Sequence, residues 1–444
     1  MKRLRMEMVV LAFTVLAFGL TGIAYAAPDP FHSGGVGSCE GCHSMHNSFE
    51  GSANVTGMAQ YTSGPFLLKA QDQSGSCLNC HQATETVGSS YHISTGGVTP
   101  LDSTSPVELT PGGDFAWLKK TMTGSVSKAA TTWEGDRHGH NIVAVDYGYT
   151  ADKKLTAAPG GSYPASGLGC QSCHDPHGRY RRLADGTQAT TGLPIFNSGS
   201  YTDSNAPIAG VSAVGVYRLL AGKNYQPKSL SGSYAFANDP PSAVAPSSYN
   251  GANTTIAGSF DKVAYGSNMS EWCANCHTTM HNDTYTSGTK GLVHPAGSGA
   301  KLTAPIAANY SAYVSSGIMT GTGANYSALA PFETGNGATL ADYTALKAFQ
   351  AAPTAPTTSN NVSCLSCHRS HASAFESMTR YNLFNEFMTV ADASNAAIYD
   401  TSTAENGINM AYNTTQQTNA YNGRPATLFG PYARNYCNKC HAKD

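Results

Sequence analysis

All twelve cysteines of this 444-residue chain belong to Cys-x-x-Cys-His units, of which there are six. In such a unit two thiols about one helical turn apart can add to the two vinyl groups of one haem, and the histidine that follows can bind the iron as its proximal ligand. The haem-attaching cysteines are Cys39, Cys42, Cys77, Cys80, Cys170, Cys173, Cys273, Cys276, Cys364, Cys367, Cys437 and Cys440. The proximal histidines are His43, His81, His174, His277, His368 and His441.

Three other uses of paired cysteines fit this pattern less well. Disulfides do not require a histidine after each pair. Zinc sites combine two Cys-x-x-Cys units within about 12–20 residues, whereas successive units here start 38, 93, 103, 91 and 73 residues apart. Thioredoxin-like redox pairs occur once per domain. The sequence therefore predicts six covalently bound haem c groups as its cofactors.

The remaining nine histidines are candidates for the distal side of the irons. His46, His177 and His371 follow a proximal histidine by three residues, and His281 follows one by four. Such a histidine lies on the wrong side to ligate its own haem, so we expect it to reach the iron of a neighbouring haem. Four more candidates in Gly-, Ser- and Pro-flanked segments are His32, His92, His140 and His294. We interpret His138 as surplus; the sequence leaves open which six histidines ligate.

The amino-terminal segment has the features of an export signal. Lys2, Arg3 and Arg5 precede an apolar run that ends at Ala24-Tyr25-Ala26, a small-x-small cleavage pattern. The alternative of a membrane anchor is weaker, because about 16 apolar residues fall short of the roughly 20 that a spanning helix needs. We predict a signal peptide over residues 1–26, a single hexahaem domain over residues 27–444, and no membrane span.

The composition predicts a fold in which haem replaces much of the apolar core. The chain contains 46 Gly and 22 Pro, and only 12% of its residues are charged. We expect mostly coil and turns with short helices and very little sheet, packed around a stacked chain of six haems, because thioether and iron–nitrogen bonds fix the backbone at many points. Residues 338–350 and 376–389 are helix candidates, and Asn141 to Tyr149 is a candidate strand.

The charge balance argues against nucleic acid as a partner. The formal net charge is −2, and two propionates on each haem make the loaded protein more negative. Arg179, Arg181 and Arg182 follow the third haem unit and are candidate propionate partners, since Arg matches a carboxylate in a bidentate manner. The alternative is an exposed basic turn.

Ligation of every iron from both sides predicts conduction rather than catalysis. A multihaem reductase needs one haem with an open face, often marked by Lys in place of the motif histidine, and all six units here end in His. No nucleophile–base constellation, phosphate loop or carboxylate pair rises above background, so no catalytic residue is assigned and we expect no enzyme activity. A reductase with one open haem is the less favoured alternative.

The segments around the haem units closely resemble those of the OmcS-type outer-surface hexahaem cytochromes of metal-reducing bacteria, and the likeness runs over essentially the whole mature chain. The matching segments are Phe31-His32-Ser33-Gly34-Gly35-Val36, Cys39 to His46, Cys77 to His81, Tyr91 to Ser94, Cys170 to Gly178, Glu271 to His277, Cys364 to His368 and Cys437 to Asp444. The resemblance implies a mostly coil fold with bis-histidine ligation of all six haems.

The same resemblance implies a function outside the cell. Members of this type polymerise head to tail into conductive filaments at the outer cell surface, with other multihaem cytochromes as donors and iron(III) oxides or partner cells as acceptors. It implies that His46 ligates the fifth haem, attached at Cys364 and Cys367, of the next subunit. A paralogue that remains a monomeric periplasmic or cell-surface shuttle is the alternative.

Overall fold

The computed structural model describes residues 39–46, 64–83, 91–100, 104–126, 129–230, 234–246, 262–283, 293–312, 326–337, 339–400 and 412–442. The predicted signal peptide, residues 1–26, and the candidate ligand His32 lie outside these ranges. Within them no helix is long and apolar enough to cross a membrane.

Short elements joined by long irregular segments make up the described chain, as the composition predicts. The α-helices are α2 (Cys39–Cys42), α3 (Gln73–His81), α4 (Met269–Cys273), α5 (Ala304–Ser311), α6 (Leu340–Ala351) and α7 (Thr414–Ala420). Single 3-10 turns relevant to the haem units are η2 (Pro65–Leu67), η3 (Phe115–Lys119), η4 (Gly135–Arg137), η5 (Val145–Tyr147), η7 (Cys170–Ser172), η8 (Tyr217–Leu219), η11 (Cys364–Ser366), η12 (Glu376–Met378) and η14 (Tyr436–Lys439); the others are η6 (Ala165–Gly167), η9 (Lys228–Leu230) and η13 (Ala426–Leu428).

The strands form small separate sheets. One is a parallel pair, β1 (Gln82–Ala83) with β2 (Ser94–Thr95). The antiparallel pairs are β3 (Met122–Val126) with β4 (Ala129–Trp133), β8 (Ser242–Val244) with β9 (Ala264–Ser267), and β10 (Thr389–Ala391) with β11 (Ala397–Tyr399). A three-stranded sheet has the order β6 (Gln188–Ala189), β5 (Arg181–Arg182), β7 (Val214–Gly215). The prediction of very little sheet is confirmed.

Helix α6 confirms the first predicted helix, over residues 338–350, within two residues at each end. Its start is fixed by a capping box, in which the Thr339 hydroxyl accepts from Asp342 N and the Asp342 carboxylate accepts from Thr339 N. Tyr343 and Leu346, on the predicted apolar stripe, are buried. They form a small cluster with Val244 and Ala264 of β8 and β9.

Two other local predictions are wrong. Residues 376–389 contain only the turn η12, because Ser377 and Met378 have positive φ angles of 55° and 50° and stop a right-handed helix. The segment Asn141 to Tyr149 is a reversed turn rather than a strand. Its η5 turn ends at Gly148, whose φ of 71° reverses the chain so that Ala144 and Tyr149 pair.

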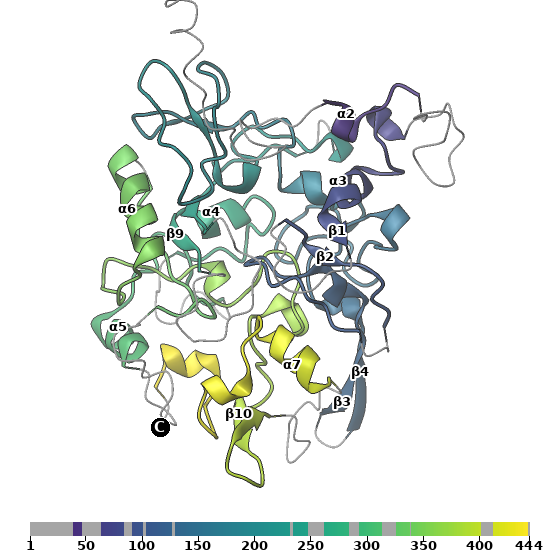
Figure 1. The fold of residues 1–444 in the computed structure, drawn as a ribbon, viewed down its shortest axis with the longest axis vertical. Helices are drawn as coiled ribbons and strands as arrows, with labels where there is room; N and C mark the ends of the chain where they lie inside the picture. Colours follow the sequence, from purple (N-terminus) through teal and green to yellow (C-terminus); the bar gives the residue numbers. More distant parts are fainter. Residues whose placement is uncertain are drawn as a thin grey trace, which may run out of the picture.

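Several apolar clusters, rather than one continuous core, fill the spaces between haem units. The largest is rich in aromatic rings, and within it Tyr399 and Tyr421 stack with ring centres 4.2 Å apart. It includes Phe375, which follows the fifth haem unit, and Tyr436, which precedes the sixth. Along the long axis of the molecule, α2 lies toward one end, and β10 and the carboxyl-terminal segment lie toward the other (Figure 1).

Candidate haem sites

Each haem unit forms a single helical turn that brings its two cysteines and its histidine to one side. The backbone N–H of His43, for example, donates to the carbonyl of Cys39 at 2.8 Å, and the same bond recurs at His174, His277, His368 and His441 at 2.9–3.0 Å. In the second unit the turn belongs to helix α3, whose amino terminus Asp72 caps by accepting from Gly75 N. All twelve cysteines are free thiols, available for thioether formation.

The proximal histidines are held in the tautomer that binds iron. In five units the ring Nδ1 lies within hydrogen-bond distance of a backbone carbonyl. The pairs are His43 with Phe66 (3.1 Å), His81 with Tyr91 (2.7 Å), His174 with Arg218 (2.7 Å), His277 with Pro159 (2.8 Å) and His368 with Ser377 (2.8 Å). Because a carbonyl only accepts, Nδ1 carries the proton and Nε2 is left for a metal.

Three of these carbonyls come from an unusual backbone clip, which the sequence analysis did not find. Two consecutive non-glycine residues adopt the left-handed conformation beside units one, three and five. These pairs are Phe66 and Leu67, Arg218 and Leu219, and Ser377 and Met378. The first residue of each pair accepts from the histidine ring, and the second accepts from the N–H that follows the histidine at 2.7–2.8 Å. Two of the segments share a leucine pair, Leu67-Leu68 and Leu219-Leu220, but the third has Met378-Thr379 in its place, so no residue pattern common to all three predicts them.

Three candidate distal histidines lie about 6 Å from a proximal histidine, measured between ring centres. The ring centres of His43 and His177 are 6.4 Å apart with an interplanar angle of 7°. The separations are 6.1 Å for His140 and His277, and 6.0 Å for His294 and His441. Two imidazoles that bind one metal from opposite sides, each through a bond of roughly 2 Å, have ring centres about 6 Å apart. The spacing therefore fits an iron between each pair.

Two further pairs are indicated by electrostatic proximity. Burial, and after it the nearby His174, lowers the pKa of His371 to about 3. Burial lowers the pKa of His81, and the nearby His92 lowers it further. Phe115 stacks on the His371 ring at 4.6 Å and fixes its position. Neutral imidazole is the form that a metal binds, so these environments favour ligation.

The remaining candidates have different surroundings. Among the described residues no ring pair with a spacing of about 6 Å includes His368, the proximal ligand of unit five. His140 and His277 lie near it, but these two rings form a pair with each other. His46 is exposed. His281 Nε2 lies 3.8 Å from Glu271 Oε1 rather than opposite a proximal ring. His138 is fully buried with its Nδ1 on the carbonyl of Trp117 at 3.0 Å, and its interpretation as surplus stays a prediction.

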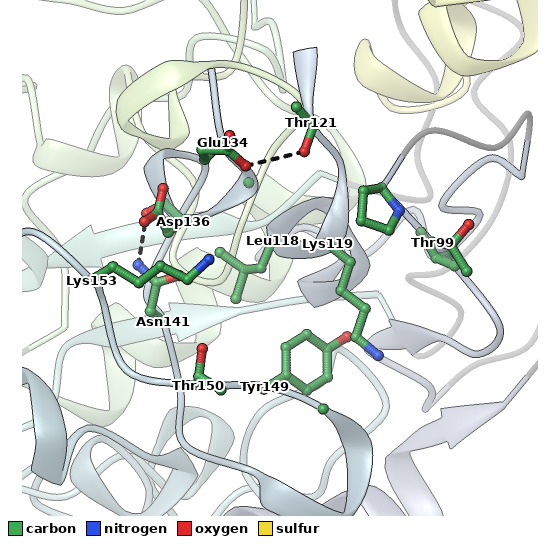
Figure 2. A pocket seen from close by; sticks show the side chains of 14 residues that line it. Thr99, Leu118, Lys119, Thr121, Glu134, Asp136, Asn141, Tyr149, Thr150 and Lys153 are labelled. Carbon is green, nitrogen blue, oxygen red and sulfur yellow. Dashed lines mark hydrogen bonds between the residues drawn. The ribbon is translucent and has the colours of Figure 1, made fainter. Parts of the chain in front are cut away.

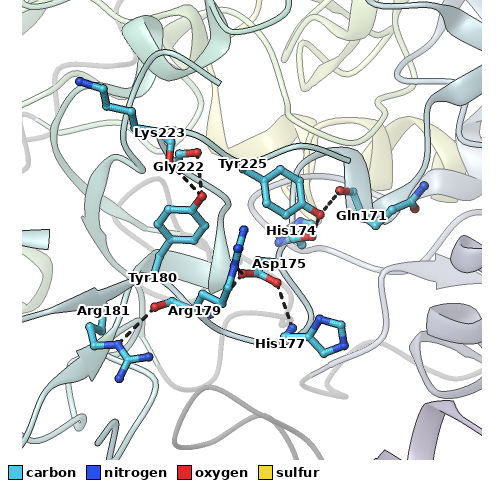
Figure 3. A network of polar contacts seen from close by, with 10 residues as sticks. All are labelled: Gln171, His174, Asp175, His177, Arg179, Tyr180, Arg181, Gly222, Lys223 and Tyr225. Carbon is cyan, nitrogen blue, oxygen red and sulfur yellow. Dashed lines mark hydrogen bonds and ion pairs between the residues drawn. The ribbon is translucent and has the colours of Figure 1, made fainter. Parts of the chain in front are cut away.

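Asp175 orders the loop that presents His177 (Figure 3). Its carboxylate accepts from the backbone N–H groups of His177 and Arg179, both at 3.1 Å, and from Arg179 Nε at 3.3 Å. The buried guanidinium of Arg182 donates to Ser242 Oγ at 2.7 Å and to a second protein acceptor, Gly337 O, and its contact with a propionate stays a prediction. Arg181 donates to Leu193 O at 2.7 Å.

The six units lie side by side in sequence order. A thiol of the neighbouring unit contributes to the raised pKa of five cysteines. The pKa values of Cys77 and Cys273 are raised mainly by hydrogen bonds with Cys170 and Cys364, whose own pKa values these bonds lower. The pKa values of Cys42, Cys173 and Cys367 are raised mainly by burial, and further by the nearby Cys80, Cys276 and Cys437. The same hydrogen bond joins units two and three and units four and five. The hydroxyl of Ser74 accepts from Cys170 N at 3.1 Å, and the hydroxyl of Ser270 accepts from Cys364 N at 3.0 Å. Thioether formation removes the thiol protons but keeps this proximity, so the attachment points form one continuous row.

The cavity in Figure 2 is not part of this row. It has a volume of about 320 Å³ and lies beside η3 and η4. Polar side chains dominate its lining, among them Lys119, Glu134, Asp136 and Lys153, and none of the lining residues belongs to a haem unit or is a paired histidine.

Comparison with known proteins decides the family. No family model matches the chain. The chain is 56% identical over 420 residues to the c-type cytochrome OmcS of Geobacter sulfurreducens, which covers 93% of this chain and 94% of that protein. The chain belongs to the OmcS family of c-type cytochromes. Its fold matches two solved structures, the OmcS nanowires and the Outer Membrane Cytochrome S filament from Geobacter sulfurreducens, each with a TM-score of 0.83 over 93% of this chain and 100% of the other.

Family membership gives the Cys-x-x-Cys-His units of this cytochrome their cofactor, haem c. The free thiols, the oriented proximal rings and the 6.0–6.4 Å ring pairs all fit haem. The protein is thus an electron-transfer cytochrome of mostly coil fold, as the sequence predicts.

Proposed function

We propose that this cytochrome polymerises head to tail into a conductive extracellular filament, in which His46 of each subunit ligates the fifth haem of the next. The observation that supports this most strongly is a repeated relation among the odd-numbered units: a histidine three residues after one unit lies beside the proximal histidine of the unit two places earlier. The histidine three residues after unit three, His177, faces His43 of unit one. The histidine three residues after unit five, His371, lies beside His174 of unit three.

The same relation leaves the distal coordination position of the fifth haem without a ligand. The corresponding histidine for unit five would belong to a unit two places further on, and the six units of the sequence do not include one. In a head-to-tail polymer that place is taken by unit one of the next subunit, whose histidine at the same offset is His46. His46 is exposed and follows α2 by four residues. Helix α2 lies toward the opposite end of the long axis from the carboxyl-terminal segment (Figure 1). A heterologous contact of this kind does not close on itself and generates a filament.

Conduction follows from what the chain does around each iron. When bound, the haems supply one-electron exchange between ferric and ferrous iron. The protein closes each iron with two imidazoles, fixes the proximal rings through backbone carbonyls, and places successive attachment points next to one another. With coordination closed the chain relays electrons without offering a site to a substrate, and we assign it no enzyme activity.

The location and the partners extend this proposal. The relatives of solved structure are a nanowire and an outer-membrane cytochrome filament, and the predicted signal peptide over residues 1–26 would export this chain. We place it at the outer cell surface, where it takes electrons from other multihaem cytochromes and passes them to iron(III) oxides or partner cells. The negative charge of the haem-loaded protein disfavours nucleic acid as a partner.

The substitution His46→Ala tests the intersubunit bond. We expect secretion and attachment of six haems to be normal, monomers or short oligomers in place of filaments, and one haem in six converted to a partly high-spin form. Electron microscopy and low-temperature EPR measure the two effects. Added imidazole should restore the low-spin spectrum without restoring long filaments.

His281→Ala is the matched control, because His281 also follows a haem unit closely but faces Glu271. It should keep both filaments and six low-spin haems. Long filaments with six low-spin haems in the His46→Ala protein would refute the proposed ligation. If whole-cell shear fractions contain wild-type protein only as monomers, the alternative of a diffusing shuttle is correct.

A further inference from the structure

Glu333 is a carboxyl group enclosed between haem units four and five. Its side chain is fully buried. Oε1 accepts from Met269 N at 2.9 Å, and Oε2 accepts from Asn361 Nδ2 at 2.6 Å. Met269 begins the single turn of α4 that ends at Cys273, and Asn361 lies three residues before Cys364. One helical turn spans about 5.4 Å, so the carboxyl lies close to both attachment points.

The backbone holds Glu333 in this place. Glu333 N donates to Asn361 O at 2.9 Å, and Asn361 N donates back to Glu333 O at 3.1 Å. A bridge to Tyr265 links the same residue to β9. These contacts fix the backbone of Glu333, and the hydrogen bonds from Met269 N and Asn361 Nδ2 hold its carboxyl at the junction.

The charges that face Glu333 do not neutralise it. Among the described residues it has no ion pair. Glu271, from the same turn of α4, is a second carboxylate and raises the pKa of Glu333. Lys301 binds the far end of the Asn361 side chain, Nζ to Oδ1 at 3.3 Å, and so reaches Glu333 only through that amide. Cys273 and Cys364 become thioethers on haem attachment and then cannot titrate.

We infer that Glu333 takes up a proton when electrons occupy haems four and five, and so couples their reduction to pH; this rests on the proposed function of the chain as an electron conductor. In the step, one electron from the preceding haem reduces ferric to ferrous iron, and one proton from bulk water converts the Glu333 carboxylate to the carboxylic acid. The charge at the junction is unchanged. When the electron moves on, the proton returns to water.

The sign of the effect follows from linkage. Burial raises the pKa of Glu333 to about 7 despite the two hydrogen bonds that lower it. An added electron nearby raises the pKa further, since a second negative charge in a poorly solvated site is repelled. Well below about pH 7, Glu333 is protonated in both redox states. Above pH 7, reduction is accompanied by proton uptake. The reduction potential of the junction must then fall as pH rises.

Proton uptake on full reduction of the holoprotein filament, measured with a pH indicator dye near pH 8, tests the inference. Glu333→Gln should take up as much as about one proton fewer per chain than the wild type. Glu134→Gln, which removes an exposed carboxylate, is the control and should match the wild type. Spectroelectrochemical titration of the same samples should show a weaker fall of potential with pH in the Glu333→Gln protein alone.

A second measurement needs no substitution. The reduced-minus-oxidised infrared difference spectrum of wild-type filaments should contain the carbonyl band of a newly protonated carboxylic acid, shifted in heavy water. Glu333→Asp should retain the band and Glu333→Gln should lose it. Absence of the band in the wild type, or unchanged proton uptake in a folded Glu333→Gln protein, overturns the inference. Neither result affects the filament proposal, which is tested separately by electron microscopy of the same samples.

Discussion

At the scale of single residues, the account depends on which histidine faces which. Sequence patterns predicted six proximal ligands and a set of eight candidates for the distal side. They could not assign the pairs, because His177 reaches a ring 134 positions earlier in the chain, at His43, and only tertiary structure creates such a pair. The +3 offset was the useful signal, since it predicts that a histidine serves a different unit from its own, and the position of His177 beside His43 fits this prediction.

The pairing of His177 with the first haem can be tested by changing the ligand. In His177→Met, thioether ligation should keep the iron low-spin and raise the potential of one haem, by on the order of 0.1 V, because Met in place of His favours the ferrous state. Potentiometric titration with visible spectroscopy measures the change. His177→Ala should instead open that iron and allow carbon monoxide to bind. A variant that still shows six closed haems would remove His177 from the ligand set.

At the scale of elements, prediction succeeded where local chemistry decides the structure. Helix α6 was predictable because apolar residues at steps of three coincide with a local cap at Thr339. The segment after residue 376 also has an apolar stripe, but the carbonyl of Ser377 is needed by the His368 ring, and this contact holds the backbone in a left-handed conformation. The contact joins residues that no local periodicity connects.

The left-handed clips carry strain that can be measured. Ser377→Gly should raise the free energy of unfolding by about 1 kcal/mol, because glycine adopts a positive φ without the steric cost paid by other residues. The bond to His368 uses the backbone carbonyl, so the haem spectrum should not change. Thermal unfolding of the holoprotein gives the stability difference. Ser377→Val is the opposite control and should be destabilised, and a Gly variant less stable than the wild type would contradict the strain.

At the scale of the whole molecule, the row of haem units explains both the fold and its assembly. Composition indicated that cofactor would replace part of the core, and the described chain is indeed a set of short elements and separate clusters between attachment points. Head-to-tail growth could not be derived from the motifs alone. We propose it from the offset that His177 and His371 share, which only the tertiary structure shows.

The most direct test of the central claim is a helical reconstruction of the assembled wild-type protein by electron microscopy. The account predicts continuous density from the His46 ring of one subunit to the iron of the fifth haem of the next, with imidazoles on both sides of all six irons. A fifth haem ligated by a residue of its own chain, or by water, would contradict it.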